Sequence, residues 1–191
     1  TKKEILSKSA IHRELSKYLI PNISTISFDY LTNINENPLI NAVYLNDYQL
    51  VKFLVYKGIG ICETHCSNCL DYYEHTALIH AAKRGYYKCV EILAKTEELG
   101  MRDINGNTAL MWASIYGNDK CVDILAKTKE LGTINNGMTA LIFAASNGNA
   151  KCVEILAKTK EIGMKDNIEH TSLMFASSNG YDNCVAILTK T

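Results

Sequence analysis

Residues 108–127 read TALMWASIYGNDKCVDILAK, and closely similar stretches begin at Thr76, Thr139 and Thr171. The four starting points are separated by 32, 31 and 32 residues. A fixed period of this length predicts a small structural unit that is stacked along an axis, with each copy burying its apolar face against its neighbours. Such a stack offers extended binding surfaces more readily than an active-site cleft.

Each copy has the pattern of two short helices joined by a tight turn. Apolar residues recur at helical spacing from Leu110 to Tyr116, Gly117 ends this run, and a second run starts at Cys121. The opening threonine can accept hydrogen bonds from backbone donors at the N-terminus of the first helix. Segments rich in Gly, Asn and Asp separate the copies and favour turns. The predicted fold class is therefore all-α, a solenoid of stacked helix-turn-helix units with protruding turn fingers.

Composition argues against several classes of function. The chain has 20 Lys and Arg against 20 Asp and Glu, so it has no overall field that would gather nucleic acid or an anionic membrane. No apolar run approaches the roughly 18 residues that a membrane span needs. We expect a cytoplasmic monomer that binds neither nucleic acid nor membrane.

Four of the seven cysteines, Cys89, Cys121, Cys152 and Cys184, occupy the same place in successive copies. Helices of adjacent units pack about 8–10 Å apart, whereas a disulfide needs Cα atoms within about 7 Å. We therefore expect free thiols that act as small hydrophobic residues, as suits a reducing compartment.

One copy carries, in order, Asp103, Gly106, Thr108, Leu110, Ala113, Gly117, Val122 and Leu125. At these positions the copies resemble the ankyrin repeat, which has an Asp, then Gly-x-Thr-Pro-Leu-His-x-Ala-Ala, a Gly, and Val with Leu-Leu in its second helix. Because the His of the family is replaced in every copy, the resemblance implies that the turns lack the hydrogen bonds it gives. The TALM opening and the LAKTKELG stretch are also similar to ankyrin proteins of diplomonad protists, some of which carry a kinase domain in the same chain.

The resemblance divides the chain into about five units. Residues 37–75 fit a degenerate first copy with a cysteine-rich insertion. The units that follow are 76–107, 108–138, 139–170 and 171–191, and the last is expected to be incomplete because the chain stops inside its expected second helix. We interpret residues 1–36 as an N-terminal capping helical segment, and the alternative is the tail of a preceding domain. The start at Thr1 in place of Met indicates a fragment of a longer protein.

The insertion is the segment with the most conspicuous potential chemistry. Cys62, His65, Cys66 and Cys69 supply donors that zinc prefers, and Cys66-x-x-Cys69 has the spacing of half a tetrahedral site. No second paired half follows, so a redox disulfide and a plain exposed loop stay open as alternatives. We adopt the plain loop, without metal or cofactor. Because the rest of the chain has no phosphate-binding loop or nucleophile motif, we expect no enzymatic activity.

By resemblance to the family, a partner protein docks on the turn tips and on the adjoining ends of the first helices. The copies also differ most at these positions, as expected of a recognition face, although neutral drift of exposed residues gives the same pattern. Carried over position by position, with His80 added from the ladder described next, the candidate binding residues are Tyr72, Tyr73, His75, His80, Lys83, Arg84, Ile104, Asn105, Asn107, Ile115, Tyr116, Asn135, Asn136, Met138, Ser146, Asn147, Asn167, Ile168, His170, Ser178 and Asn179.

Two further patterns concern the first helices. His80, Trp112, Phe143 and Phe175 share one position, which favours core packing between units over an aromatic stripe that grips a partner. The candidate surface is aromatic and basic at one end and rich in Asn and Ser at the other. Since Tyr and Arg are enriched among interface hot spots, we expect the end around Tyr72, Tyr73 and Arg84 to contribute most of the binding energy.

The function predicted from the sequence is a non-catalytic scaffold or adaptor that binds another protein. Two alternatives stay open. The chain is a targeting or regulatory segment of a larger enzyme such as a kinase, or it is a binding module regulated by zinc or thiol chemistry.

Overall fold

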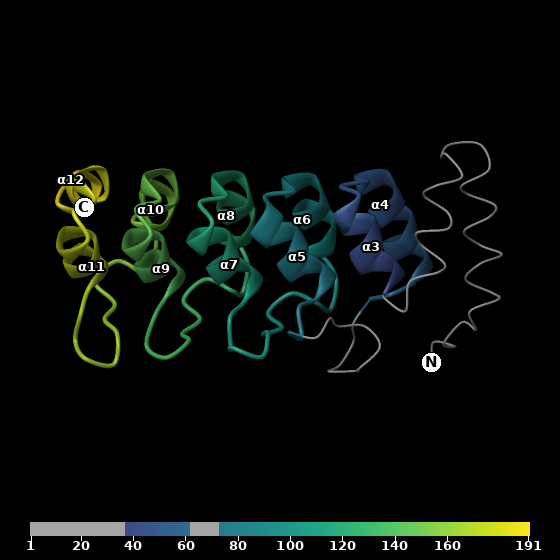
Figure 1. The fold of residues 1–191 in the computed structure, drawn as a ribbon, viewed down its shortest axis with the longest axis horizontal. Coiled ribbons are helices and arrows are strands. Elements are labelled where there is room, and N and C mark those ends of the chain that lie inside the picture. The colour runs from purple at the N-terminus through teal and green to yellow at the C-terminus, as the bar shows by residue number, and fades with distance from the viewer. Residues whose placement is uncertain (1–36, 62–72) are drawn as a thin grey trace.

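The structure is a computed structural model that describes residues 37–61 and 73–191 (Figure 1). The predicted capping segment and most of the cysteine-rich insertion lie outside the described residues. Figure 1 shows helix pairs standing side by side in one row, with the long connecting turns along a single edge. Over the described ranges the fold is an all-α repeat without strands, so the predicted fold class is confirmed.

The pairs form two layers, which we call inner and outer. The inner layer contains the first helix of each pair, and the turns adjoin this layer (Figure 1). The inner helices are α3 (Pro38–Tyr44), α5 (Ala77–Arg84), α7 (Ala109–Ile115), α9 (Ala140–Ser146) and α11 (Ser172–Ser178). The outer helices are α4 (Tyr48–Lys57), α6 (Tyr87–Leu93), α8 (Asp119–Leu125), α10 (Ala150–Leu156) and α12 (Asp182–Leu188).

The repeated threonines start the inner helices as predicted. The side chain of Thr108 caps α7 by accepting a hydrogen bond from the backbone N–H of Met111, and Thr76, Thr139 and Thr171 cap their helices in the same way. α3 starts differently, because the side chain of Asn37 accepts from the N–H of Leu39. The helices are short, so their stability depends on these caps and on packing between units.

A single hydrophobic core runs through all five pairs. Small residues such as Ala113 and Ala144 are fully buried where inner helices meet, which allows close approach. The four repeated cysteines are buried and free, as predicted. No helix of the described part is long and apolar enough to cross a membrane.

The last pair differs from its sequence interpretation. α12 is as long as α8 and α10, with seven residues each. The second helix of this unit therefore reaches the usual length before Thr191, whereas the sequence interpretation placed the end of the chain inside it.

Candidate binding surface

Two of the turn fingers are held closed by an aspartate side chain, Asp103, which is buried, and Asp166, which is half-buried. Asp103 Oδ1 accepts hydrogen bonds from the backbone N–H groups of Asn105 and Asn107 at 2.9 and 2.8 Å. Its Oδ2 accepts from Trp112 Nε1 of α7 at 2.7 Å. Asp166 closes the last described finger with the same pair of backbone contacts. The Asp103 finger is therefore closed on itself and tied to the inner layer by one carboxylate.

Neighbouring fingers also bind one another. Asn135 Nδ2 donates to the backbone oxygen of Asn105 at 2.9 Å and to Asn107 Oδ1 at 2.8 Å. One finger back, the N–H of Ile104 donates to the oxygen of Tyr73 at 3.1 Å. These contacts join three successive fingers into one edge.

A buried glutamate in each of three units stabilises the helix ends beside the fingers. Glu130 Oε2 accepts from the N–H of Leu110 at 2.7 Å, and its Oε1 accepts from the N–H of Gly100 in the preceding unit at 2.9 Å. Glu161 makes the same two contacts, to Leu141 in its own unit and to Gly132 in the preceding unit, and Glu98 makes the first, to Leu78. The three side chains are at most 1% exposed. Burial raises the pKa of Glu130 and of Glu161, and the N–H donors oppose that rise.

These glutamates correct one inference drawn from the missing family histidine. The turns do not lack support, because a carboxylate binds the turn glycine and the start of an inner helix together. The signal was available in the sequence, since Glu98, Glu130 and Glu161 stand at the same distance from the opening threonine of their units.

Asparagine side chains clamp the other ends of the inner helices. Asn118 Nδ2 donates to the carbonyl oxygens of Ala82 and Lys83, at the end of α5 in the preceding unit. Asn149 does the same for Ser114 and Ile115 at the end of α7. Both ends of an inner helix are thus fixed by side chains, and the surface built on them is rigid.

Most candidate residues from the sequence reach this surface. The exposed ones are Tyr73, Arg84, Ile104, Asn105, Tyr116, Asn136, Asn147, Asn167, Ile168, His170, Ser178 and Asn179. The half-buried ones are Lys83, Ile115, Asn135, Met138 and Ser146. Tyr72 lies outside the described residues.

Three of the candidates, His75, His80 and Asn107, are buried, with at most 8% exposed. His75 Nε2 lies 3.4 Å from Asp103 Oδ2, and the rings of His75 and His80 meet edge to face at 5.2 Å. These side chains support the fingers and offer a partner little surface.

The ladder in the inner helices is only partly core. His80 is buried, but Trp112, Phe143 and Phe175 are half-buried. Trp112 packs against the hydrophobic core as expected, although all three larger rings keep part of their surface exposed. Helical spacing places them on one face, but it does not show whether another layer covers that face.

The described residues contain no group of three or more His, Cys, Asp or Glu that could hold a metal ion. The zinc and disulfide alternatives concern Cys62, His65, Cys66 and Cys69, which lie outside the described residues.

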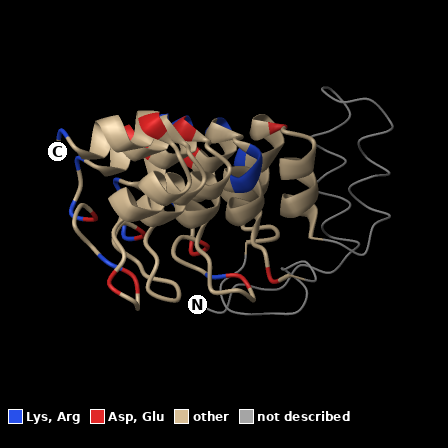
Figure 2. Ribbon diagram, turned by 60° about the vertical axis from the view of Figure 1, so that its left-hand side comes forward, with Lys and Arg blue, Asp and Glu red and all other residues tan. Residues whose placement is uncertain are grey.

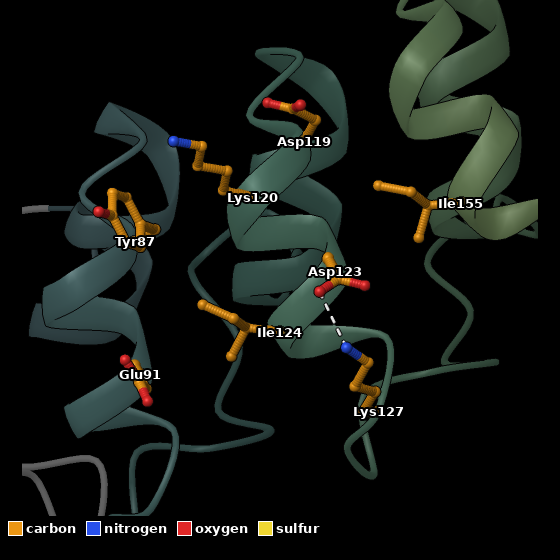
Figure 3. Close-up of a pocket in the computed structure, with 8 residues that line it drawn as sticks. All are labelled: Tyr87, Glu91, Asp119, Lys120, Asp123, Ile124, Lys127 and Ile155. Carbon is orange, nitrogen blue, oxygen red and sulfur yellow. Dashed lines mark hydrogen bonds and ion pairs between the residues drawn. The ribbon is translucent and has the colours of Figure 1, made fainter.

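An open hollow lies on the outer layer, between α6, α8 and α10 (Figure 3). Its lining mixes acidic and basic side chains, and Lys127 forms an ion pair with Asp123 at 2.8 Å. Both partners are mostly exposed, so this pair has the character of a solvated helix face. We do not assign a site to this hollow.

Comparison with known families agrees with the geometry. A family model described as ankyrin repeats, three copies, matches residues 60–135 and 127–191, and the chain belongs to the ankyrin-repeat family. No curated protein matches the chain. Ankyrin repeats generally mediate protein–protein interaction.

Proposed function

We propose that this chain is a non-catalytic scaffold or adaptor module, which binds another protein through its fingers and the adjoining face of its inner layer. It acts in the cytoplasm as a monomer and needs no cofactor. The observation that carries the proposal is the separation between constant and variable residues within the chain. Thr108, Leu110 and Cys121 recur in other copies and are 0% exposed, whereas the variable Ile104 and Tyr116 are 61% and 53% exposed.

The fingers present a row of apolar side chains to solvent. One large apolar residue is exposed on each of the four described fingers, namely Tyr73, Ile104, Ile134 and Ile168, at 54%, 61%, 47% and 67%. Burying such side chains against a partner is favourable by roughly 25 cal/mol per Å² of apolar surface removed from water. Because the fingers are already fixed by Asp103, Asn135 and Glu130, association costs little ordering entropy.

The test compares a finger variant with a matched outer-layer variant. The finger variant carries Tyr73→Ser, Ile104→Ser and Ile168→Ser, and the control carries Tyr56→Ser and Tyr87→Ser in the outer helices α4 and α6, which also remove exposed apolar side chains. Both are compared with the parent chain by quantitative affinity capture from cells, and each specific protein is then purified and its Kd measured. We expect a partner that the control retains and the finger variant loses. Equal binding to all three chains would contradict the proposal.

The finer sequence predictions belong to the same proposal. The similarity to diplomonad repeats, and with it a kinase in the same chain, stays a prediction. The larger contribution to binding energy expected from the end around Tyr72, Tyr73 and Arg84 also stays a prediction. Once the partner is known, a comparison of its affinity for Tyr73→Ala and for Asn179→Ala tests it.

A further inference from the structure

We propose that the inner layer around Lys83 and Arg84 binds a short extended protein segment that carries two or more Asp or Glu side chains. This inference rests on the proposed function and narrows the chemistry of the partner. It is based on one pair of basic side chains, Lys83 and Arg84, which lie against aromatic rings on the otherwise uncharged inner helices.

The inner layer has almost no charge. α3, α7, α9 and α11 contain no Asp, Glu, Lys or Arg, whereas α5 ends with Lys83 and Arg84. Figure 2 shows most of the helical ribbon in tan, with other charged residues gathered along one edge of the row of helices and in the connecting turns. The net charge of the chain is zero, so any selection of an acidic partner must come from such a local feature.

Aromatic rings from the two neighbouring units hold both cations. Lys83 Nζ lies 4.5 Å from the centre of the Trp112 ring and 5.7 Å from that of Tyr116. The Arg84 guanidinium lies 4.5 Å from the centre of the Tyr44 ring. The rings are fixed in turn, because Trp112 donates to Asp103 and the Tyr44 hydroxyl lies 3.3 Å from His80 Nε2. The cations are therefore positioned before any partner arrives.

Neither cation is paired with a carboxylate among the described residues. Glu74, an exposed acid near the finger base, forms no ion pair with them. The N–H donors of Lys83 and Arg84 are thus available to carboxylates on a second molecule.

Folding does not require this charge. A cation in the last turn of a helix complements the helix dipole, which is a possible structural role for both residues. However, the other four inner helices form without any basic residue in their last turn. The cations are therefore dispensable for the repeat, and their charge is better explained by recognition.

The geometry favours separate carboxylates over phosphate or bases. Lys83 lies over a ring of the following unit and Arg84 over a ring of the preceding unit, so the two cations offer two separate points of charge in place of one compact phosphate site. They also cover ring faces on which nucleic acid bases would stack. The cluster spans three units, which is roughly 16–20 Å at the usual helix spacing and matches about five or six extended residues.

Trp112 is the only tryptophan of the chain and lies under Lys83, so its fluorescence reports directly on this site. The full chain is titrated with a labelled peptide of five Glu-Ser pairs, and binding is followed by anisotropy and by Trp112 emission. Parallel titrations use a Gln-Ser peptide, a phosphoserine–glycine peptide and oligouridine. We expect binding of the Glu-Ser peptide, weakened by salt, and at least tenfold weaker binding of the other three.

The variants are Lys83→Gln with Arg84→Gln, and Lys120→Gln as the matched control, since Lys120 lies over the Tyr87 ring at 4.9 Å on the outer layer. We expect the double variant to weaken binding of the Glu-Ser peptide at least tenfold and the control to change it less than twofold. This inference is overturned if the Glu-Ser peptide does not bind, if the Gln-Ser peptide binds equally well, or if the chain prefers the phosphoserine peptide or the RNA. It is also overturned if the double variant binds the Glu-Ser peptide as the parent chain does. If a natural partner is lost by the finger variant but retained by the double variant, the proposed function stands and only the acidic specificity fails.

Discussion

The buried carboxylate of Glu130 accepts a hydrogen bond, at 2.9 Å, from the backbone N–H of Gly100 in the preceding unit. Its other oxygen binds the start of α7, so one side chain fixes the distance between a finger and its neighbour. Glu161 repeats the arrangement one unit further on. The alignment of the fingers therefore depends on these glutamates as well as on the apolar core.

We expect Glu130→Gln to destabilise the chain by about 1–3 kcal/mol near pH 5. The amide nitrogen of Gln cannot accept a hydrogen bond, so either Gly100 or Leu110 is left with a buried, unsatisfied N–H. Urea unfolding measures the effect. Glu154→Gln is the control, because Glu154 is exposed and its ion-pair partner Lys158 is exposed as well, and it should change stability by less than about 0.5 kcal/mol. Equal stability of the two variants would contradict the role of Glu130.

The loss from Glu130→Gln should also depend on pH. Burial raises the pKa of Glu130 above its ordinary value, so the folded chain holds this proton more tightly than the unfolded chain. The contribution of Glu130 to stability is then complete below the unfolded pKa of about 4.3 and is lost as pH rises through the folded pKa. Urea unfolding at a series of pH values should show the gap between the parent chain and Glu130→Gln narrowing as pH rises. A gap that widens as pH rises would show instead that folding lowers the pKa of Glu130.

The sequence was sufficient for features that depend on local pattern. The helix pairs, the caps at Thr76 and Thr108, and the buried Cys121 follow from a short period and from apolar spacing within one unit. Glu130 was missed because its burial depends on a contact with Gly100, 30 residues away, and an acid between Lys129 and Leu131 resembles solvated turn. The available signal was a glutamate that recurs at this position in three units, although the residue before it changes between Glu and Lys.

The sequence predicted where the candidate surface lies, but it did not predict which of its residues meet a partner and which support a finger. The tips at Ile104 and Ile168 lie exposed where variation among the copies placed them. His75 has an equally variable position but is buried, because it packs against Asp103 and the ring of Trp112. Variation within the chain does not separate a side chain that meets a partner from one that braces a finger.

The repeated thiols should be unreactive in the folded chain. Burial raises the pKa of Cys89 to about 11 and of Cys121 to about 12. The thiolate fraction of Cys121 at pH 8 is then about 10³-fold below that of an ordinary cysteine, and alkylation slows accordingly. Iodoacetamide labelling followed by peptide mass spectrometry should find Cys121 slower than Cys89, and both fast in urea. Labelling of folded Cys121 at the rate of a peptide thiol would exclude this account.

Two glycines with the same backbone conformation should tolerate alanine differently. Gly117 and Gly180 both have φ of 72°, which costs a residue with a Cβ about 1–2 kcal/mol. A Cβ on Gly117 would lie 2.7 Å from Asn149 Oδ1, whereas Gly180 has nothing within 4 Å. Gly117→Ala therefore also displaces Asn149 from Ser114 and Ile115, at about 1 kcal/mol for each hydrogen bond.

The excess cost of Gly117→Ala is tested by a double-mutant cycle with Asn149→Ala. Thermal or urea unfolding should show that the extra loss disappears once Asn149 is removed, so the two changes are not additive. Additive losses, or equal losses for Gly117→Ala and Gly180→Ala, would mean that the asparagine clamp contributes little to stacking.

Asp103→Ala tests whether a finger is rigid before any partner binds. The change removes the acceptor for Asn105 N–H, Asn107 N–H and Trp112 Nε1, which we expect to cost about 2–4 kcal/mol in all. Hydrogen exchange at these three groups should accelerate at least tenfold, and Trp112 emission should shift as the ring gains freedom.

Asp166→Ala is the matched change in the last described finger, because Asp166 binds the N–H groups of Ile168 and His170 but no indole. It should loosen that finger alone and leave exchange at Trp112 unchanged, because the two sites are separated by a whole unit. Native exchange at Trp112 in Asp103→Ala would show that the inner layer holds the ring without the finger. The proposal that rigid fingers bind the partner would then lose its main physical support, because the finger would have to become ordered during association, at a cost in conformational entropy.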